Sequence, residues 1–130
     1  MDCPDCGAET LSFPVPTELR EFLPGDEPGA ALCTRCLSLH PVADPPADQP
    51  DFQQVSTAFP GNTEAAVPMA LLVGLLENLA LYRAEISDLL ARVEQAGTDP
   101  LLVLDRLSYD EAIDADVDLA GRRTQLEQLL

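Results

Sequence analysis

The chain has 130 residues, enough for one ordinary domain or two small modules, and its 23 acidic residues against seven Arg and no Lys give a net charge of −16. Apolar residues make up 46% of it, which excludes the low-hydrophobicity profile of a disordered acidic tail. Neither half carries the one-sided concentration of basic residues that nucleic-acid binding favours.

The first 43 residues predict a small β-rich module. Three short segments have the apolar content of strands: residues 10–15, 30–33 and 37–42. Between the first two, residues 17–23 predict one or two helical turns, with Thr17 as the N-cap. The sequence DPPADQPD at residues 44–51 is rich in Pro and Asp and predicts a linker after this module.

From residue 52 onward the pattern becomes helical. Residues 65–76 are apolar nearly all round, so we expect a central helix, capped by Asn62 or Thr63, whose first turn accommodates Pro68. This run is shorter than the roughly 20 residues that cross a bilayer. The N-terminus shows neither the positive nor the apolar region of a signal peptide. We therefore expect a cytoplasmic protein that does not enter membranes.

Further helices are predicted towards the C-terminus. Four apolar side chains recur at the helical spacing i, i+3, i+4 and i+7: Ile86, Leu89, Leu90 and Val93. Gly97 closes this helix, and Asp99 as N-cap with Pro100 at N1 opens the next. Residues 110–118 are either a loop or a helix start, and beyond them one apolar stripe is formed by Leu119, Leu126 and Leu130. The pattern predicts an α+β fold whose α-helical domain, residues 52–130, is a small bundle of about four helices.

The four cysteines follow the pattern C-x2-C-x26-C-x2-C, which makes two pairs: Cys3 with Cys6, and Cys33 with Cys36. Each pair fits a tight turn that aims two sulfurs at one point, and two such turns give the tetrahedral set that Zn²⁺ prefers. Gly7 suits the end of the first turn, because that position often needs a conformation that only Gly adopts at low cost. Leu37 stands at the matching position of the second turn. The sequence predicts a structural Zn²⁺, since four thiolates leave no open coordination position.

Three other interpretations of the cysteines stay open, namely two disulfides, two redox CxxC motifs, or iron. Disulfides are disfavoured in a reducing compartment, and two redox motifs would have to be unrelated to each other. Rubredoxin holds iron on two similar knuckles, but its core is aromatic-rich, whereas this chain has 5% aromatic residues. His40, the single histidine, is either a spare ligand or a strand-surface side chain. Arg35 either offsets the charge of the thiolates or is a solvated turn residue.

Few features outside the cysteines suggest catalysis. No thiol is left for a Cys–His nucleophile pair, and the chain has neither a Lys nor a Gly-rich phosphate loop. We expect the carboxylates of Asp114, Asp116 and Asp118 to form a solvated face. Glu77, which interrupts the apolar helix, either pairs with an Arg or lies at an exposed edge. The sequence therefore predicts a protein that is not an enzyme.

The two CxxC motifs and the strand-forming segments around them resemble zinc ribbons over residues 1–43. Ribbons occur in transcription factors, ribosomal proteins, RNA polymerase subunits and interaction modules, so the resemblance implies structural zinc but no particular activity. The whole chain also resembles a family of short haloarchaeal proteins with an N-terminal ribbon and an α-helical C-terminal domain. Its acidic, lysine-free composition is similar to that of proteins from salt-loving archaea, where concentrated salt screens the repulsion between like charges.

Together these features predict a small β-rich zinc ribbon at residues 1–43, a linker at 44–51 and a helical domain at 52–130. We expect a non-enzymatic protein that binds another protein, as an accessory factor in transcription or translation. The alternative is a nucleic-acid-binding zinc ribbon, which rests on analogy of fold and on only two basic residues, Arg20 and Arg35, in the first 50. The sequence determines neither the partner's identity nor the oligomeric state.

Overall fold

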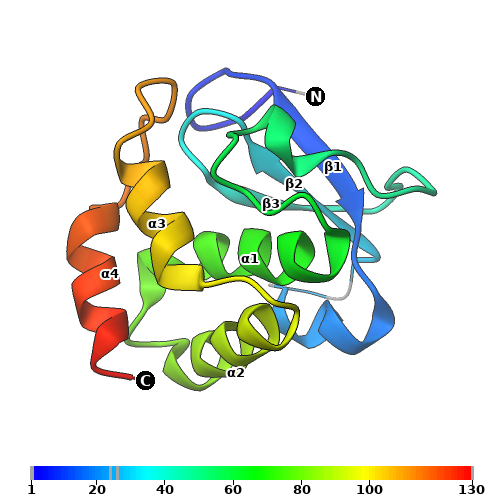
Figure 1. The fold of residues 1–130 in the computed structure, drawn as a ribbon. Coiled ribbons are helices and arrows are strands. Elements are labelled where there is room, and N and C mark those ends of the chain that lie inside the picture. Colours follow the sequence, from blue (N-terminus) through cyan, green and yellow to red (C-terminus); the bar gives the residue numbers. More distant parts are fainter. Residues whose placement is uncertain (1, 24, 26, 130) are drawn as a thin grey trace.

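The computed structural model describes residues 2–23, 25 and 27–129, and its architecture is the α+β class that the sequence predicts. A three-stranded antiparallel sheet precedes the α-helices (Figure 1). The strands are β1 (Thr10–Pro14), β2 (Gly29–Cys33) and β3 (Leu39–Val42). The α-helices are α1 (Thr63–Leu75), α2 (Arg83–Gln95), α3 (Pro100–Ser108) and α4 (Leu119–Glu127). Short 3₁₀ helices are η1 (Thr17–Phe22), η2 (Phe52–Gln54) and η3 (Leu76–Asn78).

The central strand of the sheet is β2, which pairs with β1 on one side and β3 on the other. All five of its residues are buried. Its first residue is Gly29, where an added Cβ would lie 2.4 Å from the Cβ of Pro45, so a residue with a side chain does not fit without a shift. The Gln49 side chain also donates a hydrogen bond of 2.7 Å to the carbonyl of Pro14. The Pro- and Asp-rich segment, residues 44–51, therefore packs directly on the sheet.

Helix α1 crosses the middle of the molecule, with the sheet on one side and α2 on the other (Figure 1). Ten of its 13 residues are buried, as the apolar run predicts. The side chain of Asn62 caps the helix by accepting a hydrogen bond of 3.1 Å from the Ala65 N–H. Pro68 lies further in than the first turn, at the sixth helical residue. Its ring nitrogen cannot donate to the Glu64 carbonyl one turn earlier.

The local signals for α2 and α3 are confirmed. Gly97 takes a left-handed φ of 92° just after α2. Asp99 caps α3 through a hydrogen bond of 3.0 Å from the Leu101 N–H, and Pro100 is the first helical residue. The side chains predicted on the inner stripe of α2 are all buried: Ile86, Leu89, Leu90 and Val93.

The structure corrects or completes three further expectations. The N-cap of η1 is Pro16, without a side-chain cap, and Thr17 is the first helical residue, so the predicted Thr17 cap is wrong. Residues 110–118 form a loop, at the end of which the Asp118 carboxylate caps α4. On α4 the predicted inner side chains Leu119 and Leu126 are buried. Leu130, the third member of that stripe, lies outside the described residues.

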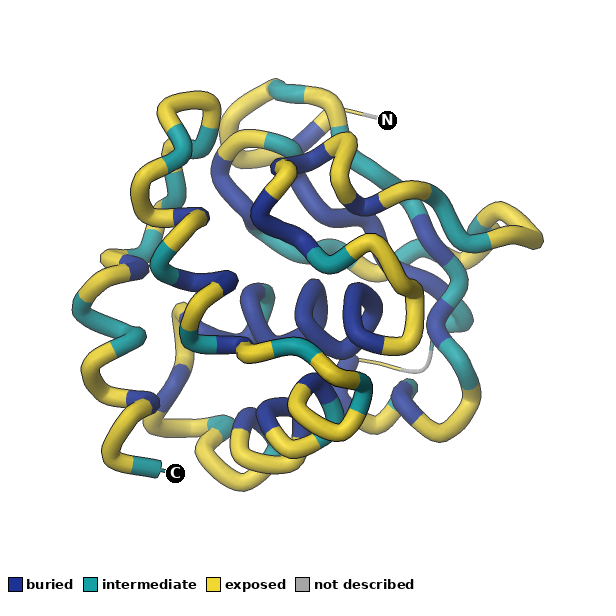
Figure 2. Tube along the Cα trace, in the orientation of Figure 1, coloured by how far each residue is buried: buried dark blue, intermediate teal, exposed yellow. Residues whose placement is uncertain are grey.

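One continuous apolar core joins the sheet to the helices (Figure 2). The ring of Phe13 on β1 meets the ring of Phe52 edge-on, with 5.0 Å between the centroids. Leu39 on β3 packs against α1 at Gly74, where an added Cβ would lie 2.6 Å from the Leu39 Cβ. Buried side chains that precede residues 44–51 in the sequence and buried side chains that follow them thus belong to the same cluster. The division into ribbon, linker and helical domain stays a prediction about folding units.

Candidate metal centre

Each of the two CxxC motifs forms a tight turn, or knuckle, and an equivalent backbone hydrogen bond closes each knuckle. The Cys3 N–H donates to the Ala8 carbonyl at 2.7 Å, and the Cys33 N–H donates to the Ser38 carbonyl at 2.9 Å. In both, the first cysteine of the pair bonds to the residue five positions further along. This closure turns the backbone back on itself and directs both sulfurs of a pair to the same side.

Each knuckle also needs one residue with a left-handed backbone, directly after its second cysteine. Gly7 has φ of 80°, which glycine adopts at no steric cost. Leu37, at the equivalent position, has φ of 64° and is the one non-glycine residue with positive φ among those the structure describes. This conformation costs a residue with a Cβ roughly 1–2 kcal/mol. Burial of the Leu37 side chain in the main core offsets that cost.

The two knuckles are joined across the end of the sheet. β1 and β2 pair up to Thr10 and Cys33. Beyond this pair, the backbone and the hydroxyl of Thr34 both donate to the Glu9 carbonyl, at 3.0 and 2.8 Å. The first knuckle is therefore held against the second by the strands that lead into and out of them.

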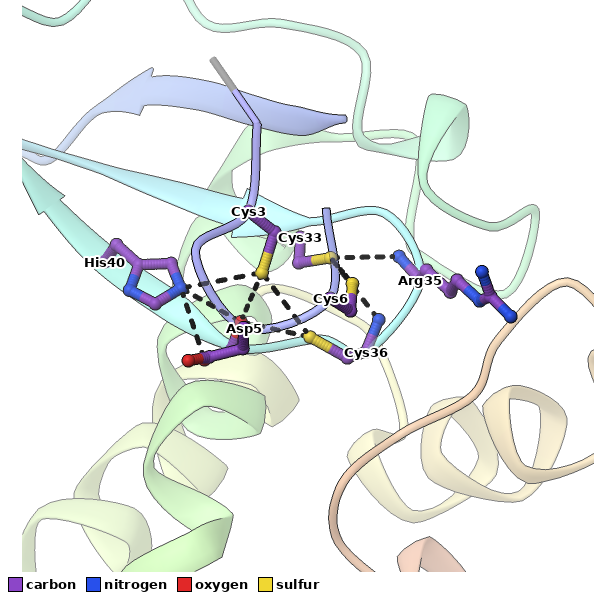
Figure 3. Close-up of polar contacts among 8 residues, drawn as sticks. Cys3, Asp5, Cys6, Cys33, Arg35, Cys36 and His40 are labelled. Carbon is purple, nitrogen blue, oxygen red and sulfur yellow. Dashed lines mark hydrogen bonds and ion pairs between the residues drawn. The ribbon is translucent and has the colours of Figure 1, made fainter. Parts of the chain in front are cut away.

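The four sulfurs converge as a result (Figure 3). All lie within 4.8 Å of one another, with 3.4 Å between the Sγ atoms of Cys6 and Cys33 and 3.7 Å between those of Cys3 and Cys36. A tetrahedral metal with bonds of about 2.3 Å separates its sulfurs by about 3.8 Å. The donor set therefore fits a single metal ion. Cys6 is exposed and the other three cysteines are buried.

Three further side chains surround the sulfurs: His40, which the sequence offers as a spare ligand or a strand-surface side chain, and Ser38 and Asp5, which the sequence did not connect with the cysteines. The Ser38 hydroxyl lies 3.3 Å from the Cys3 sulfur, 3.1 Å from the Cys36 sulfur and 3.0 Å from Nε2 of His40. His40 Nε2 is 3.8 Å from the Cys3 sulfur and 3.7 Å from Oδ2 of Asp5. His40 is thus both a residue of β3 and a neighbour of the site. Ser38 occupies the position in the second knuckle that Ala8 occupies in the first, and this position could have predicted that its hydroxyl lies near the sulfurs.

The thiols differ in how their surroundings affect ionisation. Burial raises the pKa of Cys36 to about 12 and also raises the pKa of Cys33. Burial acts in the same direction on Cys3, but hydrogen bonds from the Ser38 hydroxyl and from backbone N–H groups outweigh it and lower that pKa to about 5. Cys3 therefore offers a thiolate at neutral pH, whereas Cys33 and Cys36 keep their protons until a cation displaces them.

The sequence matches a known protein family over almost its whole length. A family model described as "Family of unknown function (DUF6276)" matches residues 2–130. The chain belongs to DUF6276. Comparisons with curated proteins and with solved structures give no match. In the part of this DUF6276 chain that the structure describes, no helix has the length and apolarity needed to span a membrane.

Arg35 and Glu77, which the sequence analysis considered for charge interactions, make no ion pair among the described residues. The backbone N–H of Arg35 donates to the Cys33 sulfur at 3.4 Å, while its guanidinium points away from the sulfurs (Figure 3). The Arg35 carbonyl accepts a hydrogen bond of 2.8 Å from the Asp114 N–H, so the second knuckle is tied to the loop before α4. Glu77 is exposed on η3 and lines a cavity of about 140 Å³ beside His40.

Proposed function

We propose that Cys3, Cys6, Cys33 and Cys36 hold one structural Zn²⁺, and that the chain is a non-enzymatic zinc-ribbon protein. The observation that carries this proposal is the convergence of all four sulfurs on one point. Four thiolates fill a tetrahedral zinc shell and leave no position for water or substrate, which is the arrangement of structural sites. The N–H groups of Arg35 and Cys36, each 3.4 Å from the Cys33 sulfur, stabilise negative charge there.

The sulfur positions support one shared ion over two separate redox motifs. Two close sulfur contacts run between the knuckles, from Cys6 to Cys33 at 3.4 Å and from Cys3 to Cys36 at 3.7 Å. In a redox CxxC the reacting sulfurs belong to the same motif. Native mass spectrometry of protein purified without added metal tests the assignment. One zinc per chain is expected, whereas two disulfides or bound iron would overturn it.

The proposed work of the protein is to bind another protein, as a cytoplasmic accessory factor in transcription or translation. Three large apolar side chains of the described residues are exposed and available for such contacts: Leu81 (73% exposed), Leu102 (44%) and Tyr109 (85%). Direct binding of nucleic acid is disfavoured, because phosphate contacts come from basic side chains and the first 50 residues contain two Arg against nine acids.

Two measurements separate these functions. Cross-linking and pull-down of the tagged chain from its native host in high salt is expected to recover a protein partner, and the Tyr109→Ala variant should recover less of it. Fluorescence anisotropy with DNA and RNA is expected to show no binding at moderate or molar salt. Micromolar binding that is lost in Arg35→Ala would instead favour the nucleic-acid alternative.

We also propose that the protein is adapted to concentrated salt, as its composition suggests. Sixteen excess negative charges repel one another over longer distances at low ionic strength, where the Debye length reaches about 30 Å. Thermal melting is therefore expected at lower temperature in dilute buffer than in molar KCl. Equal melting temperatures would contradict the adaptation without affecting the metal assignment.

A further inference from the structure

A small cavity between the start of α2 and the end of α4 differs in charge from the rest of the molecule. It has a volume of about 230 Å³, and the described residues that line it include two Arg and no Asp or Glu. Its polar walls are Arg83, Arg122, Gln125 and Gln128, and its apolar walls include Leu79 and Leu129. In a chain with 23 acidic residues and seven Arg, a cavity with this lining is a local reversal of charge.

The two Arg of this cavity lack carboxylate partners among the described residues. By contrast, Arg123 and Arg92 have carboxylate partners, with Asp105 at 2.7 Å from the first and Asp88 at 3.5 Å from the second. Arg122 instead donates to the amide oxygen of Gln125 at 2.9 Å, and Arg83 is exposed at the first residue of α2. Arg83 and Arg122 thus line one space, and no described Asp or Glu pairs with either of them.

The lining of the cavity indicates which anion suits this space. The buried Leu79 and the partly buried Leu129 offer apolar surface to a ligand. A carboxylate matches the planar fork of guanidinium and can carry an aliphatic group that fits against these two side chains.

We propose that this cavity binds an organic carboxylate with a short aliphatic group. Arg83 and Arg122 bind the carboxylate, and Leu79 and Leu129 contact the aliphatic part. On binding, Arg122 exchanges its hydrogen bond to the Gln125 amide oxygen for one to the ligand. Such a group is found both in a free fatty acid and in the C-terminal residue of a peptide that ends in an aliphatic side chain. The site lies apart from the cysteines, and none of the proposed zinc ligands lines it.

Titration of the metal-loaded chain, followed by NMR in molar KCl, tests the proposal with four probes. Hexanoate has both a carboxylate and an aliphatic group, and N-acetyl-leucine has the same two groups in the form of a peptide C-terminus. Inorganic phosphate is an anion without an apolar group, and hexanol has an aliphatic group without a charge. We expect saturable shifts of the Leu79 and Leu129 methyl signals with at least one of the two carboxylates. Tighter binding of hexanoate would indicate a free fatty acid as the ligand, and tighter binding of N-acetyl-leucine would indicate a peptide C-terminus. Phosphate and hexanol should bind at least about tenfold more weakly than the better carboxylate.

Variants decide whether the two Arg are responsible. Arg83→Gln and Arg122→Gln should each weaken carboxylate binding about tenfold, while circular dichroism and melting temperature show that the fold is retained. Arg106→Gln is the matched control, since Arg106 is also exposed but lines a different cavity with Asp110 and Glu111. The proposal is overturned if neither carboxylate saturates, if phosphate binds as tightly, or if Arg106→Gln weakens binding as much as the other two variants.

Discussion

Leu37 combines two properties that usually exclude each other in one residue. Its backbone is left-handed, with φ of 64°, and its side chain is buried in the main core. The knuckle requires the first property, because the equivalent residue Gly7 has φ of 80°. The core requires the second. Glycine and alanine substitutions at residue 37 therefore separate the backbone cost from the packing gain.

We predict an inverted order of stability for substitutions at this position. Leu37→Ala should lower the free energy of unfolding by about 3 kcal/mol through lost packing. Leu37→Gly loses the same packing but relieves the left-handed strain, so it should be about 1 kcal/mol more stable than Leu37→Ala. At Leu32, buried in β2, the same pair should show the ordinary order, with Gly less stable than Ala. Urea unfolding of the four metal-loaded variants measures this, and the ordinary order at residue 37 would contradict it.

Ser38 connects the sulfurs of both knuckles with His40, through contacts of 3.0–3.3 Å. Removal of its hydroxyl in Ser38→Ala should weaken metal binding by about tenfold or more, as is usual for groups that orient metal ligands. Ser87→Ala on the exposed face of α2 is the control. Competition with a chromophoric chelator gives both affinities. Equal affinities in the two variants would show that the hydroxyl is not needed.

The ionisation of the thiols predicts how metal binding varies with pH. In the folded chain, burial raises the pKa values of Cys33 and Cys36, so both are protonated at pH 7, whereas the pKa of Cys3 is lowered to about 5. In a chain that unfolds without metal, all four thiols return to an ordinary pKa of about 8.5 and are mostly protonated at pH 7. A metal must displace the protons of Cys33 and Cys36, so binding should release at least two protons and should tighten as pH rises through neutrality. Calorimetry at pH 7 in buffers of different ionisation enthalpy counts the protons. Release of fewer than two would contradict this.

At the scale of elements, β3 packs against α1 at Gly74 without room for a side chain. Alanine is normally about 1 kcal/mol better than glycine inside a helix. Here the added Cβ would lie 2.6 Å from the Leu39 Cβ, so we predict that Gly74→Ala destabilises the protein and shifts β3 away from α1. The double variant Gly74→Ala/Leu39→Ala keeps the Leu39 Cβ but removes its Cδ2 and Cγ, which would lie 2.7 and 3.1 Å from the added Cβ, so it should recover part of the loss. Independent, additive effects of the two substitutions would show that the elements do not touch there.

The elements that sequence reasoning predicted well are those with local causes. Asn62, Asp99 and Gly97 mark helix ends through hydrogen bonds and backbone angles that involve only neighbouring residues. The convergence of the cysteines was also predictable, because each CxxC has its own turn. The contact of Ser38 and His40 with Cys3 was not predictable, since it depends on the first knuckle folding over β3, which is distant from it in the sequence. The shared core was missed for the same reason.

At the scale of the whole molecule, the continuous core links metal binding to the helices. Structural zinc contributes of order 10 kcal/mol, which is comparable with the entire stability of a typical domain. Chelation should therefore unfold the sheet and also remove most of the helical circular dichroism signal, in one transition. Helical signal that survives chelation, while the thiols become reactive, would show instead that residues 52–130 fold independently.

The position of the knuckles in the chain has a consequence for synthesis. All four cysteines and the hydrogen bonds that close and join the knuckles lie between Cys3 and Ser38, whereas α1, which covers the sheet, ends only at Leu75. At about 5–20 residues per second, the ribosome needs about 2–8 s to add the stretch from Leu37 to Leu75. The metal ligands are thus complete in the nascent chain before their hydrophobic cover exists. An ion bound at that stage would hold the sheet as a template on which α1 then folds.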